Sequence, residues 1–176
     1  VGTLAAYWES SLELTDPIPS LNLYNEDWKL HTRSEEKPPV KFGKDACASK
    51  SLISNGSIIN GVVENSIISP GVYVEEGAVV RDSIIFNDTI IRSNSVVEKA
   101  IIDKEVEVMA NCKIGYGDDL TPNKDKPDLL ENGLNVIAKR ATIPEGTTIG
   151  RNCRIFSYVG VDDFESKEIP SGSTIS

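Results

Sequence analysis

The fold of this protein is decided by residues 52–114, which read LISNGSIINGVVENSIISPGVYVEEGAVVRDSIIFNDTIIRSNSVVEKAIIDKEVEVMANCKI. Aliphatic residues recur in this stretch at one spacing, about 17 residues, which is the signature of an internal repeat. Three series share the spacing and are offset from one another: Ile68, Ile85, Ile102; Val74, Ile91, Val108; and Val63, Val80, Val97, Ile114. One repeat therefore corresponds to one three-sided coil of the chain.

Small residues form a second periodic column. Two positions before most of these aliphatic residues stands a serine, alanine, threonine or cysteine, as in Ser57, Ser66, Ala78, Ser83, Thr89, Ser95, Ala100 and Cys112. An inward aliphatic residue with a small residue at a tight corner is the hexapeptide pattern of a parallel β-helix. One coil cannot bury its inner face alone, whereas stacked coils can. An ordinary β-sandwich has no reason to hold one period in three phases at once.

The remainder of the chain departs from this period in identifiable places. We expect a short amphipathic helix over residues 1–14, ended by Pro17 and Pro19, with little of its own to pack on. A linker follows, in which Trp28 is expected to cover the first end of the solenoid. Residues 116–133 are rich in Gly, Asp and Pro and predict a loop. The ladder then resumes at steps of six: Ile137, Ile143, Ile149, Ile155, with a last partial coil at Ile169 to Ile175.

Composition excludes several classes of protein. The net charge of −9 argues against nucleic acid, whose phosphates require a basic surface. No apolar run is long enough to span a membrane, and no signal-peptide pattern opens the chain. The odd number of cysteines lacks CxxC spacing, so Cys47, Cys112 and Cys153 are expected to be reduced thiols of a cytoplasmic protein and not metal ligands.

The sequence offers no catalytic constellation. A hexapeptide acyltransferase needs a histidine base and a β-helical carbonic anhydrase needs three histidine ligands, but the sole histidine is His31, in the linker. Phosphate-binding glycine motifs and GxSxG are absent. We therefore predict no catalytic residues and no metal ligands. Cations remain as candidate ligands for a phosphorylated metabolite, unless they are simply scattered over the surface: Arg81, Arg92, Lys99, Lys104, Lys113, Lys139, Arg140, Arg151 and Arg154.

Several segments resemble a known family. Residues 1–10, VGTLAAYWES, are similar to the GT-x-x-x-Y-W segment that closes the catalytic domain of ADP-glucose pyrophosphorylases, the glucose-1-phosphate adenylyltransferases. Residues 24–32 resemble the linker of that family, with Lys29-Leu30 in place of its common Pro-Ile. Residues 57–61, 65–72, 100–104 and 136–146 resemble its coils.

The resemblance implies a left-handed β-helix that contributes to assembly and allosteric control. It implies three parts: residues 1–16 as the last helix of an absent N-terminal nucleotidyltransferase domain, a linker over 17–43, and the β-helix over 44–176 with an insertion at about 116–134. The activity implied is the synthesis of ADP-glucose and pyrophosphate from ATP and glucose 1-phosphate, for glycogen or starch. This fragment itself is expected to be non-catalytic and without cofactors, magnesium being expected for the full-length enzyme.

The resemblance also implies a site and partners. Lys104 and Lys139 match lysines implicated in activator binding in plant-type members, and Arg140 is their neighbour. The implied partners are a phosphorylated effector and further subunits, in a homo- or heterotetramer; the implied location is the cytoplasm, or the plastid in a plant. Two alternatives stay open: a catalytically silent regulatory subunit of the same enzyme, and the tail of another sugar-phosphate nucleotidyltransferase or acyltransferase.

Overall fold

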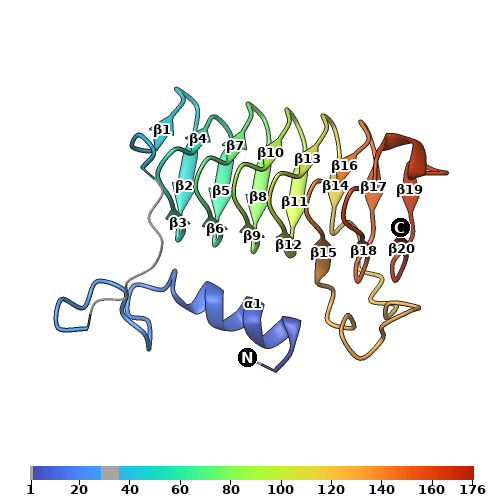
Figure 1. The fold of residues 1–176 in the computed structure, drawn as a ribbon, viewed down its shortest axis with the longest axis horizontal. Coiled ribbons are helices and arrows are strands. Elements are labelled where there is room, and N and C mark those ends of the chain that lie inside the picture. The colour runs from blue at the N-terminus through green and yellow to red at the C-terminus, as the bar shows by residue number, and fades with distance from the viewer. Residues whose placement is uncertain (1, 29–35) are drawn as a thin grey trace.

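A computed structural model describes residues 2–28 and 36–176 of the chain; His31 and the Lys29-Leu30 departure lie outside these residues. The predicted solenoid is confirmed, since every pair of neighbouring strands within its three sheets is parallel (Figure 1). Sheet A consists, in spatial order, of β1 (Lys41–Phe42), β4 (Ile58–Ile59), β7 (Tyr73–Val74), β10 (Ile90–Ile91), β13 (Glu107–Val108) and β16 (Thr142–Ile143).

Sheets B and C form the other two sides of the prism. Sheet B consists of β2 (Cys47–Ser49), β5 (Val62–Glu64), β8 (Val79–Arg81), β11 (Val96–Glu98), β14 (Lys113–Ile114), β17 (Thr148–Ile149) and β19 (Glu168–Ile169). Sheet C consists of β3 (Leu52–Ile53), β6 (Ile67–Ile68), β9 (Ile84–Ile85), β12 (Ala100–Ile102), β15 (Asn135–Ile137), β18 (Arg154–Ile155) and β20 (Thr174–Ile175). Strand β1 lies inside the segment predicted as linker, so the solenoid begins before residue 44.

The aliphatic ladders occupy the interior as the repeat predicts. Ile68, Ile85 and Ile102 are register partners in successive strands of sheet C, and each is fully buried. The series through Ile91 and Val97 behave in the same way in sheets A and B. Each such side chain contributes roughly 1.5–3 kcal/mol by leaving water, so the stack supplies the core that a single coil lacks.

The small corner residues are buried because their side chains bridge consecutive coils. The Ser66 hydroxyl accepts a hydrogen bond from the amide of Ser83 at 3.1 Å, and the Ser83 hydroxyl accepts one from the amide of Ala100 at the same distance. The backbone amides at these corners are thereby satisfied away from water. A larger side chain would have to displace this internal column.

The helix α1 (Leu4–Glu13) is shorter than the predicted 1–14. Thr3 caps its N-terminus, and the Thr3 hydroxyl accepts a hydrogen bond from the amide of Ala6. The expectation that it has little to pack on is wrong. It lies along the outer face of sheet C (Figure 1), where Leu12 is 7% exposed and joins a second apolar cluster. That cluster contains Ile84, Ile101, Leu130 and Leu134, with Leu4, Tyr7, Trp8, Ile67, Phe86 and Val136 at its margin.

Two further segments frame the solenoid. Between β14 and β15 the chain leaves the coils, and this insertion contains Leu130 and Leu134 of the second cluster. Ahead of the solenoid in the chain, the side chain of Trp28 is 64% exposed, so the expectation that it covers the first coil is wrong. A short 3-10 helix, η1 (Val161–Asp163), interrupts the last coils. Among the described residues, no helix has the length and apolarity needed to cross a membrane.

Candidate anion-binding site

The predicted cations Lys104, Lys139 and Arg140 come together on the corner that leads from sheet C to sheet A. Ile102 and Ile137 are register partners in β12 and β15, so Lys104 and Lys139, two residues further on, occupy equivalent places in adjacent coils. The Arg140 amide donates to the Lys104 carbonyl at 3.1 Å, which fixes the stacking of the two turns. Adjacent strands lie about 4.8 Å apart, so the two lysines extend from neighbouring turns of the backbone. We call this group the anion corner.

The anion corner depends on a backbone conformation that its residues adopt at a cost. Glu105 and Arg140 both have a φ of +59°, and Tyr158, in the next coil, has a φ of +66°. Earlier coils place Gly56 and Gly71 at the equivalent position, where positive φ is free of side-chain strain. The stacking of successive turns therefore imposes this conformation on the later, bulkier residues.

The three cations differ in their pairing. Arg140 binds Glu105 through two contacts, Nε to Oε2 at 2.7 Å and Nη2 to Oε1 at 3.3 Å. Among the described residues, neither Lys104 nor Lys139 forms an ion pair, and both side chains are exposed. The Lys139 ammonium lies 5.7 Å from the centre of the Tyr158 ring. Two lysines without carboxylate partners are therefore free to bind an anion by charge-assisted hydrogen bonds.

The ion pair between Arg140 and Glu105 also shifts the pKa of both side chains. The hydrogen bond from Arg140 holds the pKa of the Glu105 carboxyl below its usual value, and the same bond raises the pKa of Arg140. Both side chains are about half exposed to solvent, so the pair is screened by salt and contributes little to stability. Its consequence is that Glu105 stays ionised and occupies Arg140, leaving the lysines as the anion ligands.

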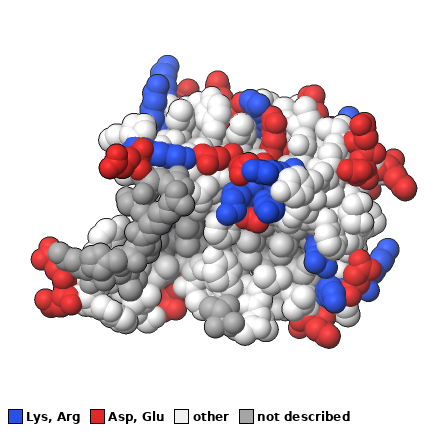
Figure 2. Space-filling view, in the orientation of Figure 1, with Lys and Arg blue, Asp and Glu red and all other residues white. Residues whose placement is uncertain are grey.

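The other predicted cations do not belong to this corner. Arg92 binds Glu75 and Glu107 at 2.8 and 2.7 Å, and its pKa is raised by these hydrogen bonds. Arg81 binds Glu64 at 3.1 Å. Figure 2 shows the general pattern, in which blue cations lie beside red carboxylates on the face drawn. Arg81, Arg92 and Arg151 therefore have carboxylate partners, whereas Lys99, Lys113 and Arg154 lie over aromatic rings elsewhere on the solenoid.

The described residues also include two buried thiols, Cys112 and Cys153. Burial raises the pKa of the thiols of Cys112 and Cys153, which disfavours the reactive thiolate. Among these residues no group of three His, Cys, Asp or Glu side chains could hold a metal ion. Cys112 and Cys153 therefore serve as the small corner residues that the repeat predicts.

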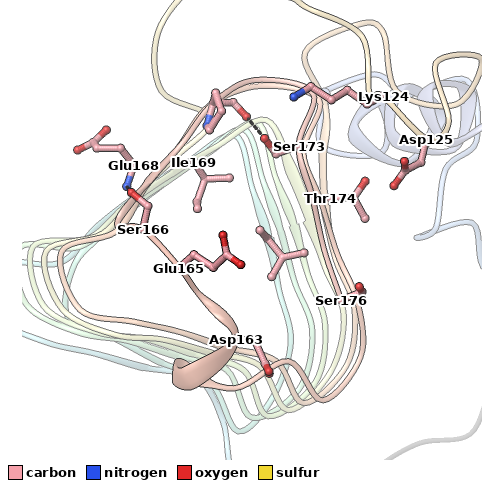
Figure 3. A pocket seen from close by; sticks show the side chains of 12 residues that line it. Lys124, Asp125, Asp163, Glu165, Ser166, Glu168, Ile169, Ser173, Thr174 and Ser176 are labelled. Atoms are coloured by element: carbon pink, nitrogen blue, oxygen red, sulfur yellow. Dashed lines mark hydrogen bonds between the residues drawn. The ribbon is translucent and has the colours of Figure 1, made fainter.

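A hollow of about 500 Å³ opens at the last coil, and the apolar side chains of Ile169 and Ile175 line it. Figure 3 shows Ile169 together with the polar residues around it. Glu165, Glu168 and Asp163 line the hollow together with Lys124. Carboxylates outnumber cations around this hollow, so it is poorly suited to a phosphorylated ligand. The anion corner remains the better candidate.

Tyr158 and Glu105 belong to the corner but were not identified from the sequence. A signal for Tyr158 was present, because the coils after the insertion step by about 18 residues and Tyr158 stands one step beyond Arg140. Its hydroxyl lies 3.4 Å from Nη1 of Arg140. Glu105 carries no such signal, since its pairing with Arg140 spans the 35 residues that include the insertion.

Parallel coils of hexapeptides around an aliphatic interior place the chain in the class of hexapeptide-repeat left-handed β-helices. The family model described as GlmU-like, C-terminal hexapeptide matches residues 38–137, and the chain belongs to that family. Nearly its whole length, 99%, is also similar to curated proteins named glucose-1-phosphate adenylyltransferase. The identity is 39% over 175 residues for Acetivibrio thermocellus, 46% over 193 for Thermomicrobium roseum and 48% over 175 for Pseudothermotoga lettingae. The chain spans 41% of the length of each of these relatives.

Proposed function

We propose that this chain is the effector-binding and assembly part of a glucose-1-phosphate adenylyltransferase. Relatives with that name match 99% of the chain, and the resemblance found in the sequence leads to the same enzyme. The reaction would be the synthesis of ADP-glucose and pyrophosphate from ATP and glucose 1-phosphate. Residues outside this chain would perform it, because the described residues offer neither a general base nor a phosphate-binding loop.

The observation that carries the regulatory role is the pair of lysines at the anion corner. Lys104 and Lys139 lie one above the other in adjacent coils without carboxylate partners, in a chain of net charge −9. Like charges on neighbouring strands oppose each other, and a bound phosphate relieves that repulsion. The ligand class that this favours is a phosphorylated sugar or a phosphorylated acid.

Magnesium is expected for the full-length enzyme, as it is for most nucleotidyl transfer. The described residues do not fit it, because they lack a cluster of three metal-ligating side chains. We therefore assign no residue of this chain to the metal. A cytoplasmic location remains part of the proposal.

Assembly is the second part of the proposed role. On the outer face of sheet A, Ile58, Tyr73 and Ile90 are register neighbours, and Ile58 is 38% exposed. This apolar stretch supports association with further subunits in a homo- or heterotetramer. Symmetric assembly would also give the effector two quaternary states to distinguish, which is what allosteric control requires.

Binding and activation test the proposal together. The 176-residue chain is titrated with fructose 1,6-bisphosphate, a phosphorylated sugar, and with 3-phosphoglycerate, a phosphorylated acid, by calorimetry. We expect Lys104→Ala and Lys139→Ala each to weaken binding by about tenfold, the loss of one charge-assisted hydrogen bond. In a full-length adenylyltransferase that carries this chain, the same changes weaken activation and leave the basal rate unchanged.

Lys113→Ala is the matched control, because Lys113 is an exposed lysine of β14 in sheet B that lies beside Tyr116. It should bind both ligands like the unmodified chain. Equal affinity of all three variants for both ligands would remove the anion corner from the proposal.

A further inference from the structure

The insertion, residues 116–134, packs in one apolar cluster with α1 and sheet C. Leu130 and Leu134 are each 2% exposed and share an apolar cluster with Leu12 of α1. Ile84 and Ile101 of sheet C form the floor of the same cluster. A segment that reads as loop in the sequence thus contributes its buried leucines to the contact between the helix and the solenoid.

Two buried asparagines fix the insertion to the corner of the last coils. Asn123 is 1% exposed, and its Nδ2 donates to the carbonyls of Asn152 and Gly172 at 3.1 and 3.3 Å. Asn152 is fully buried; its Nδ2 donates to the Leu120 carbonyl at 3.1 Å and its Oδ1 accepts from the Gly133 amide at 2.6 Å. Side-chain amides buried and bonded in this way hold a loop in one position. These hydrogen bonds therefore hold the insertion, including the part that packs against α1, in place on the last coils.

Lys99 joins the insertion to α1 directly. Its ammonium donates to the carbonyl of Asn132 and lies 5.3 Å from the centre of the Trp8 ring. The indole Nε1 of Trp8 donates to the Asp82 carbonyl at 2.7 Å, which holds the ring in place. The half-buried side chain of Lys99 therefore interacts with both the helix and the insertion. If either segment moves away, Lys99 loses one of these two interactions.

Only the short strand β15 and one further residue separate the insertion from Lys139 of the anion corner. The insertion ends at Leu134, β15 follows as Asn135–Ile137, and Lys139 stands two residues later. Val136 of β15 packs against the cluster that holds α1. Asn135 is 1% exposed, and its Nδ2 has no hydrogen-bond partner among the described atoms, so β15 carries a polar atom at a cost.

We propose that the insertion and Lys99 link the anion corner to α1, so that an anion bound by Lys104 and Lys139 tightens the hold on the helix. The bound charge relieves the repulsion between the two lysines, which steadies β15 and with it Leu134 and Val136. This inference rests on the proposed function, because it requires an anion at the corner. It adds the route by which occupancy of that corner reaches a different part of the molecule.

The experiment uses Trp8 as its reporter. The 176-residue chain contains two tryptophans, and Trp28→Phe leaves Trp8 as the single one. Fructose 1,6-bisphosphate is titrated while calorimetry records binding, fluorescence records Trp8, and amide hydrogen exchange records α1. We expect exchange of the α1 amides to slow by about fivefold at saturation, the low end of allosteric coupling, with a midpoint equal to the calorimetric one.

Lys99→Met tests the route, because methionine keeps the apolar stem and loses the ammonium. The variant should bind the ligand with unchanged affinity but slow the α1 amides by less than about twofold. Lys113→Met is the matched control: the same substitution beside Tyr116 in sheet B should keep the full response. Circular dichroism verifies folding, and Lys99→Gln replaces Lys99→Met if the latter does not fold.

The outcomes separate the two proposals. Calorimetric binding without any change in α1 exchange or Trp8 emission overturns the link and leaves the effector site standing. A full response in a folded Lys99 variant overturns the assigned route. Absence of binding by the unmodified chain overturns the proposed function, and the link with it.

Discussion

The outer faces of sheets A and C carry similar residues and have different fates. Ile58 of sheet A and Ile84 of sheet C both point outward from two-residue strands, next to inward partners that are fully buried. Ile58 is 38% exposed, whereas Ile84 is 2% exposed because α1 and the insertion cover it. The repeat specifies the inside of the prism identically on each side, but it does not specify what lies outside.

This difference has a physical origin. The inner ladder is local, since each aliphatic residue meets its equivalent one coil later. The cover on sheet C is not local, since Leu12 shares one apolar cluster with residues as distant in the chain as Ile84 and Leu134. Burying such outer side chains contributes roughly 1.5–3 kcal/mol each, so a covered face can hold a helix and an uncovered face remains available for other contacts.

The largest expected effect comes from truncating Ile84, with Ile58 as the matched comparison. Ile84→Ala removes atoms that are buried under α1 and leaves a cavity, so the free energy of unfolding should fall by about 2–4 kcal/mol. Ile58→Ala, on the bare face, should cost less than about 1 kcal/mol. Urea unfolding followed by circular dichroism measures both. Similar losses at the two positions would mean that α1 does not shield sheet C in solution.

An intermediate effect is expected from the tryptophans. Trp8→Phe removes the donor that satisfies the Asp82 carbonyl and weakens the contact with Lys99. The free energy of unfolding should therefore fall by about 1–3 kcal/mol. Trp28→Phe is the control, since Trp28 is exposed. The comparison is sharpened if Trp8→Phe also speeds hydrogen exchange in α1 without affecting the inner strands. Identical unfolding midpoints for both variants would contradict a docked helix.

The smallest effect belongs to the exposed corner. Arg140 lowers the pKa of Glu105 in the folded state, so the pair stabilises the protein above the unfolded pKa of a glutamate, and this contribution disappears as the pH falls through the folded pKa. Glu105→Gln should therefore lower Tm slightly at pH 7, by less than about 2 °C, and not at all at pH 2. Thermal scans of both proteins at the two pH values provide the measurement. A gap that widens in acid would show that the sign is wrong.

The fold was predictable because the repeat is carried by residue type at fixed intervals. Ile68, Ile85 and Ile102 were placed in one ladder by counting, and the structure places them in register. The candidate site stays a prediction: Lys104 and Lys139 came from the resemblance, and the register shows only that they occupy equivalent positions in adjacent coils. Glu105 and Tyr158 were not predicted, because their roles depend on pairings across the insertion and across a coil.

The docking of α1 was predicted wrongly for a related reason. An amphipathic pattern says that a helix buries one face, but not which surface receives it, since any apolar surface of suitable shape can do so. The insertion likewise showed Leu129, Leu130 and Leu134 among polar and turn-forming residues, without a repeat that would mark them as buried. Its buried asparagines acquire their function only through the carbonyls that the last coils present.

The sequence by itself determined the triangular coil and its ladders, because a short period forces equal residues into equal environments. The tertiary structure alone decided which outer face is covered, which cations keep a carboxylate partner, and how near the anion corner lies to the helix. Those outcomes depend on contacts between residues distant in the chain, whose free energies are fixed by shape and charge in space and not by spacing along the sequence.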